Sequence, residues 1–100
     1  MHYPIDESVK LLGRRHAAPV LLEIMSGRNQ FNTLLQVIPG VNTKTLSARL
    51  DEFERSGLIQ RMEETGSHPR QVHYVLTSKG EGMRSLIREI VSFTMKWNLA

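Results

Sequence analysis

Small polar and cationic side chains gather at the start of one predicted helix, which spans about residues 42–56. Its inward face is an apolar stripe formed by Leu46, Leu50 and Phe53. At 100° per residue, the opposite face begins with Lys44, Ser47 and Ala48. Such short side chains can approach the edges of DNA bases in the major groove, where hydrogen-bonding groups distinguish the base pairs. This face is therefore predicted to contact DNA.

The charges along the same helix follow an unusual order. Its acidic side chains all lie in the second half and are Asp51, Glu52 and Glu54. The helix dipole normally favours carboxylates in the first turn, so a basic start followed by acids departs from a local preference. Sequences often break such preferences at functional sites. The acids are expected to point away from the groove, although a solvated face of mixed charge would show a similar composition.

Three further side chains are candidates for the DNA backbone. Arg28 precedes another predicted helix, whose free N–H groups can help to hold a phosphate. His68 and Arg70 lie in a loop segment without acids and can reach a phosphate or a minor groove. The complete set of predicted DNA contacts is Arg28, Asn42, Thr43, Lys44, Ser47, Arg49, His68 and Arg70.

Five helices are predicted to position these residues. Apolar spacing places them at about residues 5–12, 20–25, 29–37, 42–56 and 78–97. Pro19 is expected either in the first turn of the second helix or at a kink in a longer one. Asn42 and Gly57 are the predicted caps of the fourth helix. Ser78 and Glu81 have the spacing of a capping box at the start of the last helix.

Two segments change from the helical period to strand-like alternation. They span residues 58–63 and 72–76, and a polar loop of residues 64–71 joins them as a hairpin. The order helix, helix, turn, helix, hairpin, helix is that of a winged helix-turn-helix. We therefore predict one α+β domain, mainly α, over residues 1–100. Its parts are a helix-turn-helix at about 29–56, a two-stranded wing at about 58–76 and a C-terminal dimerisation helix at about 78–97.

Two antiparallel strands cannot bury the strongly apolar last helix and three other helices equally well. A terminal helix of this kind often packs on a partner, so we predict a homodimer. The predicted interface residues are Met83, Leu86, Ile87, Ile90, Phe93 and Trp97. Such a dimer would place two recognition helices about 34 Å apart, one turn of duplex DNA.

Composition excludes several other classes of protein. The 100 residues contain no cysteine, which excludes disulfides, zinc ribbons and thiol nucleophiles within them. No apolar run is long enough to span a membrane. The first residues lack the basic start and apolar run of a signal peptide, so a cytoplasmic protein is expected. The net charge of +3 is mild and by itself says little about acidic partners.

Histidines and serines lack the spacing of a metal or catalytic site. His16, His68 and His73 share no helix face and are predicted to be structural or solvated. The serines lie at caps, on a helix face or in a loop, and none lies in a glycine-rich nucleophile turn. No phosphate-binding loop is present. We expect no enzyme activity, metal or cofactor.

An ordered set of short segments runs along most of the chain without an insertion between them. The segments are Gln30–Leu34, Ile38–Val41, Lys44–Leu50, Glu52, Glu54, Gly57–Ile59, Tyr74–Thr77 and Gly80, and Trp97 also fits. The set resembles the HxlR-type winged-helix transcriptional regulators. The resemblance implies a homodimeric DNA-binding repressor or activator, whose N- and C-terminal helices form the dimer interface. It also implies recognition-helix contacts by Thr43, Lys44, Ser47 and Arg49.

The sequence departs from the family it resembles at three places. Family members commonly have Cys-Pro near the N-terminus, where this chain has Tyr3-Pro4, so sensing through that thiol is excluded. The second helix opens with Gly13-Arg14-Arg15-His16 in place of Gly-Gly-Lys-Trp, and Pro19 falls where the family continues a helix.

Two alternative functions remain open. One is a winged helix that binds proteins, and the other is a regulator with a small-molecule effector at the dimer interface near Tyr3 and Trp97. The cationic set Lys44, Arg49 and Arg70 favours DNA over a purely protein-binding role. A winged helix that binds only proteins has no need to keep acidic residues away from the surface that carries these cations.

Overall fold

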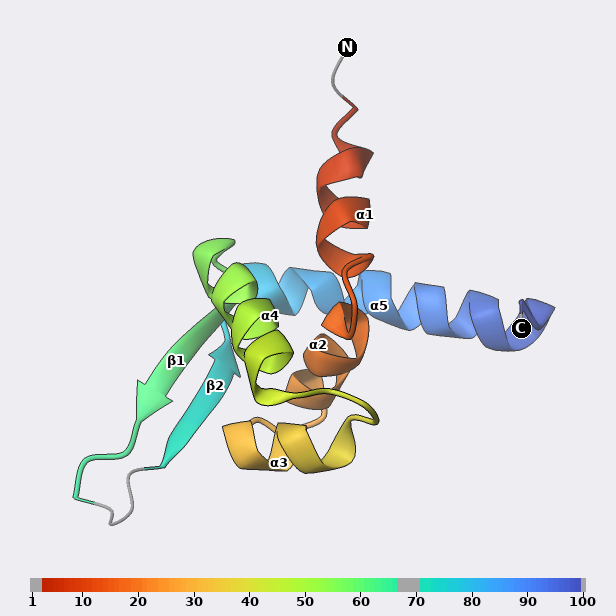
Figure 1. The fold of residues 1–100 in the computed structure, drawn as a ribbon. Coiled ribbons are helices and arrows are strands. Elements are labelled where there is room, and N and C mark those ends of the chain that lie inside the picture. The colour runs from red at the N-terminus through yellow and green to blue at the C-terminus, as the bar shows by residue number, and fades with distance from the viewer. Residues whose placement is uncertain (1–2, 67–70, 100) are drawn as a thin grey trace.

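The computed structural model describes residues 3–66 and 71–99, which form five helices and a two-stranded antiparallel sheet (Figure 1). The elements are α1 (Ile5–Leu12), α2 (Ala17–Met25), α3 (Phe31–Val37), α4 (Thr43–Arg55), β1 (Ile59–Glu63), β2 (Val72–Leu76) and α5 (Ser78–Trp97). This order confirms the predicted mainly helical α+β class. The helix-turn-helix consists of α3 and α4, and the wing consists of β1 and β2.

Local signals place the ends of α4 where the sequence predicts them. Asn42 Oδ1 accepts a hydrogen bond from the backbone N–H of Thr45 at 2.8 Å, which satisfies one free donor of the first turn. Beyond the other end, Gly57 has a φ of +78°, a left-handed conformation that favours glycine. Both predicted caps of α4 are confirmed.

The helix α2 begins three residues before its predicted start at Val20. Pro19 is the third residue of α2 and lies in its first turn. An N–H at that position has no acceptor within the helix, so the proline costs no helical hydrogen bond. The prediction that Pro19 lies in the first turn of the second helix is confirmed, and the alternative of a kink in a longer helix is not.

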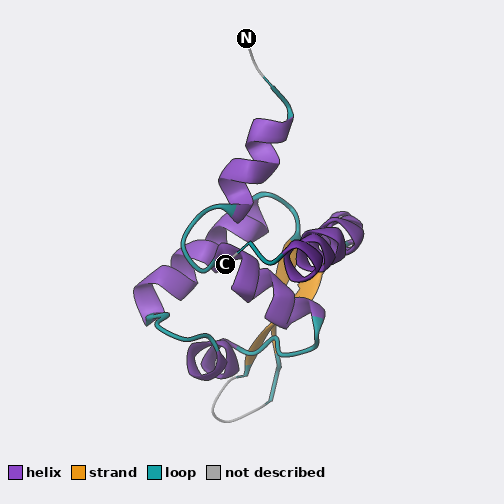
Figure 2. Cartoon of the chain, turned by 90° about the vertical axis from the view of Figure 1, so that its right-hand side faces the viewer, coloured by secondary structure: helices purple, strands orange, loops and turns teal. Residues whose placement is uncertain are grey.

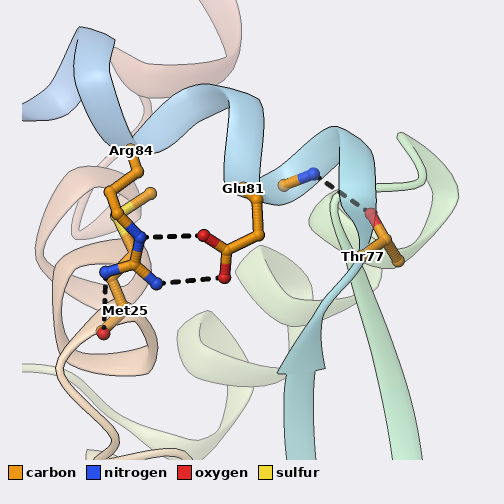
Figure 3. A network of polar contacts seen from close by, with 5 residues as sticks. Met25, Thr77, Glu81 and Arg84 are labelled. Carbon is orange, nitrogen blue, oxygen red and sulfur yellow. Dashed lines mark hydrogen bonds and ion pairs between the residues drawn. The ribbon is translucent and has the colours of Figure 1, made fainter.

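The predicted capping box at Ser78 is wrong by one residue, because Thr77 caps α5. The Thr77 hydroxyl oxygen accepts a hydrogen bond from the backbone N–H of Gly80 at 3.1 Å (Figure 3). The same hydroxyl donates to the carbonyl of Gly57, in the link between α4 and β1. Gly57 lies 20 positions away along the chain. Residues close to Ser78 in the sequence therefore do not indicate that Thr77 is the cap.

A polar network ties α5 to the end of α2 (Figure 3). The guanidinium of Arg84 donates two hydrogen bonds to the Glu81 carboxylate, at 2.9 and 3.1 Å. It donates a third to the carbonyl of Met25 at 3.2 Å. The hydrogen bonds from Arg84 are the main reason why the pKa of Glu81 is lowered. The network helps to set the direction in which α5 leaves the domain.

The hairpin is joined to the start of the helix-turn-helix. β1 and β2 pair in antiparallel register, with Arg61 opposite Tyr74 and Met62 opposite His73. Gln30, just before α3, forms an isolated bridge with His73. The backbone N–H of Tyr74 donates to the carbonyl of Asn29 at 2.9 Å. Backbone hydrogen bonds therefore hold the middle of β2 against the segment that leads into α3.

The buried core draws on every element except α1. Its largest fully buried side chains are Phe53, Leu21, Leu34, Leu46, Leu50, Ile59 and Val20. The predicted inward stripe of α4 is confirmed, because all three of its members are buried here. Ile87 is the one apolar residue of α5 in this buried set and is only 3 % exposed.

Two helices project from this body. Figures 1 and 2 show α1 rising from the rest of the chain, at the end opposite α3, and Figure 1 shows the C-terminal half of α5 extending beyond the other elements. No residue of α1 is buried, and every residue from 88 to 99 is exposed. Within residues 3–66 and 71–99, no helix is long and apolar enough to cross a bilayer.

Candidate nucleic-acid interface

The first turn of α4 presents an exposed polar surface. Asn42, Thr43 and Lys44 are all exposed, and Ser47 lies half-buried one turn further along. Among the described residues, no carboxylate lies within 4 Å of the Lys44 ammonium. The Asn42 side-chain oxygen accepts the hydrogen bond from the N–H of Thr45. The amide NH₂ of Asn42 therefore remains available as a donor. The start of α4 therefore offers several donors and an uncompensated positive charge.

A polar cleft of about 530 Å³ lies between α3, α4 and the wing. Its lining residues are Gln30, Phe31, Asn32, Ser47, Asp51, Arg61, Gln71, Val72 and Tyr74. Among the described residues of the predicted DNA-contact set, Ser47 is the one that lines this cleft. Hydrogen-bonding groups from three elements thus face one opening, beside the exposed start of α4.

Arg61 and Tyr74 form the wing side of the cleft. The Arg61 guanidinium donates to Glu63 at 2.8 Å, and this hydrogen bond is the main reason why the pKa of Arg61 is raised. Burial raises the pKa of the Tyr74 phenol, while its hydrogen bond to Arg61 acts in the opposite direction. Arg61 therefore remains a cation at the mouth of the cleft, facing a neutral phenol.

Six polar residues of the cleft are absent from the predicted contact set: Gln30, Asn32, Asp51, Arg61, Gln71 and Tyr74. The acids of α4 were expected to point away from the groove, but Asp51 lies one turn after Ser47 and lines the cleft with it. Its i, i+4 spacing from Ser47 was a usable signal. The position of Arg61 depends on the strand register, which the alternation of the strand alone does not define.

Arg49 does not lie on the exposed side of α4. Its side chain is 14 % exposed and its Nη1 lies 3.3 Å from the Glu52 carboxylate. Arg14, in the turn between α1 and α2, approaches the same carboxylate at 3.7 Å. Glu52 is thus held between two guanidinium groups. The predicted DNA contact by Arg49 stays a prediction, and because its charge is committed to this ion pair we leave it out of the proposed DNA contacts.

The remaining predicted contacts fall into two groups. Arg28 is exposed, and its guanidinium pairs with Glu23 of α2 at 3.2 Å. An exposed pair of this kind contributes little stability and can be exchanged for a phosphate. His68 and Arg70 lie outside the described residues.

The described histidines occupy structural positions. His16 is the left-handed N-cap of α2, and its Nε2 accepts a hydrogen bond from Arg15. His73 lies in β2. Within residues 3–66 and 71–99, no group of three His, Cys, Asp or Glu side chains is placed to hold a metal ion.

Apolar side chains cover the two projecting helices. The exposed residues of the predicted α5 interface are Leu86, Ile90, Phe93 and Trp97, and Trp97 is 61 % exposed. An apolar cleft of about 460 Å³ runs between α1, α2 and α5, and Ile5 and Val9 of α1 contribute to it. Ile87 is 3 % exposed and belongs to the core of the same chain, but it also lines this cleft, so its interface role stays a prediction. Met83 is half-buried and packs on that core.

Comparison with known proteins identifies a family. A model described as "HxlR-like helix-turn-helix" matches residues 11–100. The uncharacterised HTH-type transcriptional regulator YvaP of Bacillus subtilis is 28 % identical over 94 residues, covering 92 % of this chain and 84 % of YvaP. The regulator sll1512 of Synechocystis is 32 % identical over 94 residues, covering 94 % of this chain and 69 % of the relative. Both relatives are described as transcriptional regulators rather than enzymes.

Solved structures show the same architecture. The reduced form of the transcriptional regulator YodB from B. subtilis superposes with a TM-score of 0.78 at 29 % identity, covering 94 % of this chain and 92 % of YodB. The HTH-type regulator YtcD gives a TM-score of 0.87 over 99 % of this chain and 100 % of its own. Its identity is 18 %, so that likeness concerns the fold alone.

Proposed function

The chain belongs to the HxlR-like helix-turn-helix family of transcriptional regulators, and we propose that it binds double-stranded DNA as a homodimer. In this proposal α4 enters the major groove and the wing lies on the backbone or in the minor groove. The observation that carries the proposal is the exposed first turn of α4, with its uncompensated Lys44 beside the polar cleft.

The charge distribution supports this orientation of α4. Thr43 and Lys44 lead the helix into the groove, where Ser47 follows on the same side. Glu52 is neutralised by Arg14 and Arg49, so it does not oppose the phosphates. Within the described residues the first turn of α4 carries no acid.

Asp51 adds a constraint on the bases that α4 can accept. A carboxylate beside Ser47 repels phosphate but accepts a hydrogen bond from the amino group of cytosine. Asp51 therefore favours a cytosine where the third turn of α4 approaches the groove. A replacement of Asp51 by Asn should relax this preference rather than abolish binding.

The DNA-binding proposal is tested with duplexes selected by the protein from a genomic fragment library. We expect the affinity, measured by fluorescence anisotropy, to fall steeply with salt because bound cations displace counterions. Lys44→Ala should reduce the salt slope by about one if Lys44 contacts phosphate, and Ser47→Ala should cost about 1–3 kcal/mol at one base if it reads that base. Arg88→Ala on α5 is the matched control, since it removes one exposed charge elsewhere.

The DNA-binding proposal fails if no duplex is enriched, or if Lys44→Ala and Ser47→Ala bind like the Arg88→Ala control. A winged helix used only to bind proteins would give the first of these results.

The homodimer is proposed from the two projecting helices. A monomer rarely exposes a contiguous apolar surface of this kind, because burying it is favourable. The apolar side chains of α1 and α5 lie around one shared cleft, so a second copy can cover both helices at once. The exposed apolar face of α5 continues beyond that cleft to Trp97.

Light scattering coupled to gel filtration tests the dimer. Ile90→Asp should give a monomer at micromolar concentration, because it places a carboxylate on the exposed apolar face of α5. Ser92→Asp is the control, since it adds the same charge on the opposite side of the helix. A monomeric wild-type protein, or equal masses for the two variants, would overturn the dimer proposal.

A further inference from the structure

A third cleft lies apart from the DNA-facing cleft and next to the apolar cleft of α1 and α5, with which it shares Ser8. It has a volume of about 520 Å³ and is walled by α1, the C-terminal end of α4 and the start of α5. Its size is within the range of small-molecule sites. Neither the family match nor the relatives' descriptions assign a role to it.

Positive charge predominates around this cleft. Four cations line it, Lys10, Arg14, Arg55 and Lys79, against two carboxylates, Glu7 and Glu52. Glu52 is already paired with guanidinium groups. The rim therefore carries more positive charge than its own acids compensate.

Three of these cations, Lys10, Arg55 and Lys79, have no carboxylate partner within the described residues. No carboxylate oxygen lies within 4 Å of the Lys10 ammonium or the Arg55 guanidinium. The Lys79 ammonium donates to the neutral carbonyl of Ser56 at 2.6 Å, at the end of α4. Lys10 from α1 and Arg55 from α4 thus approach one opening as free cations.

The inner surface of the cleft is apolar. Leu58 is buried in the core, and Leu11 and Met83 pack against that core while lining the cleft. A cation-bearing rim over an apolar floor is complementary to a molecule with an anionic head and a hydrophobic body. An inorganic anion would leave the floor in contact with water.

We propose that this cleft binds a small amphipathic organic anion, such as an aromatic carboxylate. The carboxylate lies between Lys10 and Arg55, and the apolar body rests on Leu11, Leu58 and Met83. The 100 residues contain no cysteine, so a bound molecule of this kind provides a signal that needs no thiol.

Binding is coupled to the DNA contacts through the cleft walls, a consequence that rests on the proposed function. The walls belong to the helix that carries the recognition surface and to the two helices of the proposed dimer interface. A ligand that fits one relative placement of these helices better than another shifts the DNA affinity, and DNA shifts the ligand affinity by the same factor.

The site is tested on the DNA-free protein with 2-naphthoate as the probe and neutral 2-naphthamide as its control. Calorimetry should show binding of the carboxylate at millimolar concentration or below, and about tenfold weaker binding of the amide. The double variant Lys10→Gln/Arg55→Gln should weaken 2-naphthoate to a similar extent. Arg88→Gln, which removes an exposed charge outside the cleft, should leave the affinity within about twofold.

Methionine methyl NMR locates the probe within the protein. The Met83 signal, assigned with a Met83→Leu variant, should shift on titration, whereas that of Met95, exposed near the end of α5, should not. Absence of binding, equal affinity for the two probes, an unaffected double variant, or a shift of Met95 without Met83 would each overturn the site. Binding that leaves DNA affinity unchanged would overturn only the coupling, and failure of DNA binding itself leaves the calorimetric result intact.

Discussion

Gly80 lies in the first turn of α5, where the helix is packed closely against Leu58 and Leu76. A Cβ added at this position would lie 2.0 Å from the carbonyl oxygen of Leu58 and 3.0 Å from Leu76 Cδ2. Contacts below 3.0 Å are essentially never observed for a Cβ, so Gly80→Ala requires a displacement of about 1 Å. The obstacle is backbone, which cannot turn aside as a flexible side chain would.

The free energy of the change follows from two opposing effects. In an open helical position, Ala is more favourable than Gly by up to about 1 kcal/mol. Overpacking a closed site costs about 1–3 kcal/mol or more. Because the overlap with Leu58 is severe, we expect Gly80→Ala to lower the free energy of unfolding by about 2 kcal/mol.

Gly82 provides a matched control in the same helix. A Cβ at Gly82 meets nothing within 4 Å, so Gly82→Ala should raise the free energy of unfolding by up to about 1 kcal/mol. Urea denaturation followed by circular dichroism measures both variants, at equal protein concentration. The reasoning is refuted if Gly80→Ala is as stable as the wild type, or if both substitutions change stability in the same direction.

Three other perturbations test the described contacts. Thr77→Ala should cost about 1 kcal/mol of unfolding free energy because α5 loses its N-cap, and Thr77→Ser should retain most of it in the same urea assay. The pKa of Glu81 lies below its ordinary value of 4.5 because of Arg84; the pair therefore stabilises the fold above that pH, and its contribution is lost as the pH falls through the lowered pKa. Glu81→Gln should flatten the acid limb of stability against pH, and an unchanged limb would contradict the assignment. Arg49→Ala should lower the free energy of unfolding by about 1 kcal/mol because the pair with Glu52 is lost. The DNA affinity of the folded variant should be unchanged. A selective loss of DNA affinity would instead support the predicted DNA contact by Arg49.

The sequence predicts the elements whose determinants are local. The ends of α4 follow from the cap of Asn42 and from Gly57, both of which act within a few residues of the helix. The hairpin and its two strands follow from alternation and from the polar residues between them. Here, propensity and periodicity agree with the tertiary packing.

The differences arise where a partner is distant in the chain. Thr77 replaces Ser78 as the cap because its hydroxyl also reaches Gly57. Arg49 pairs with Glu52, whose carboxylate is also approached by Arg14 from the distant turn between α1 and α2. Ile87 enters the core, although its spacing with the other apolar residues of α5 predicts an interface position. Each outcome depends on the placement of whole elements, which a single sequence does not define.

The backbone bond from Tyr74 to the carbonyl of Asn29 and the bridge between Gln30 and His73 affect how the protein can meet a curved duplex. Because backbone hydrogen bonds join the middle of β2 to the segment entering α3, we expect these two segments to move together. In the proposed complex, the distance between the groove that α4 would occupy and the DNA backbone under the wing would then be set by the protein. A half-site of a different width would be accommodated by deforming the DNA, so the stiffness of the base steps in between becomes part of what is recognised.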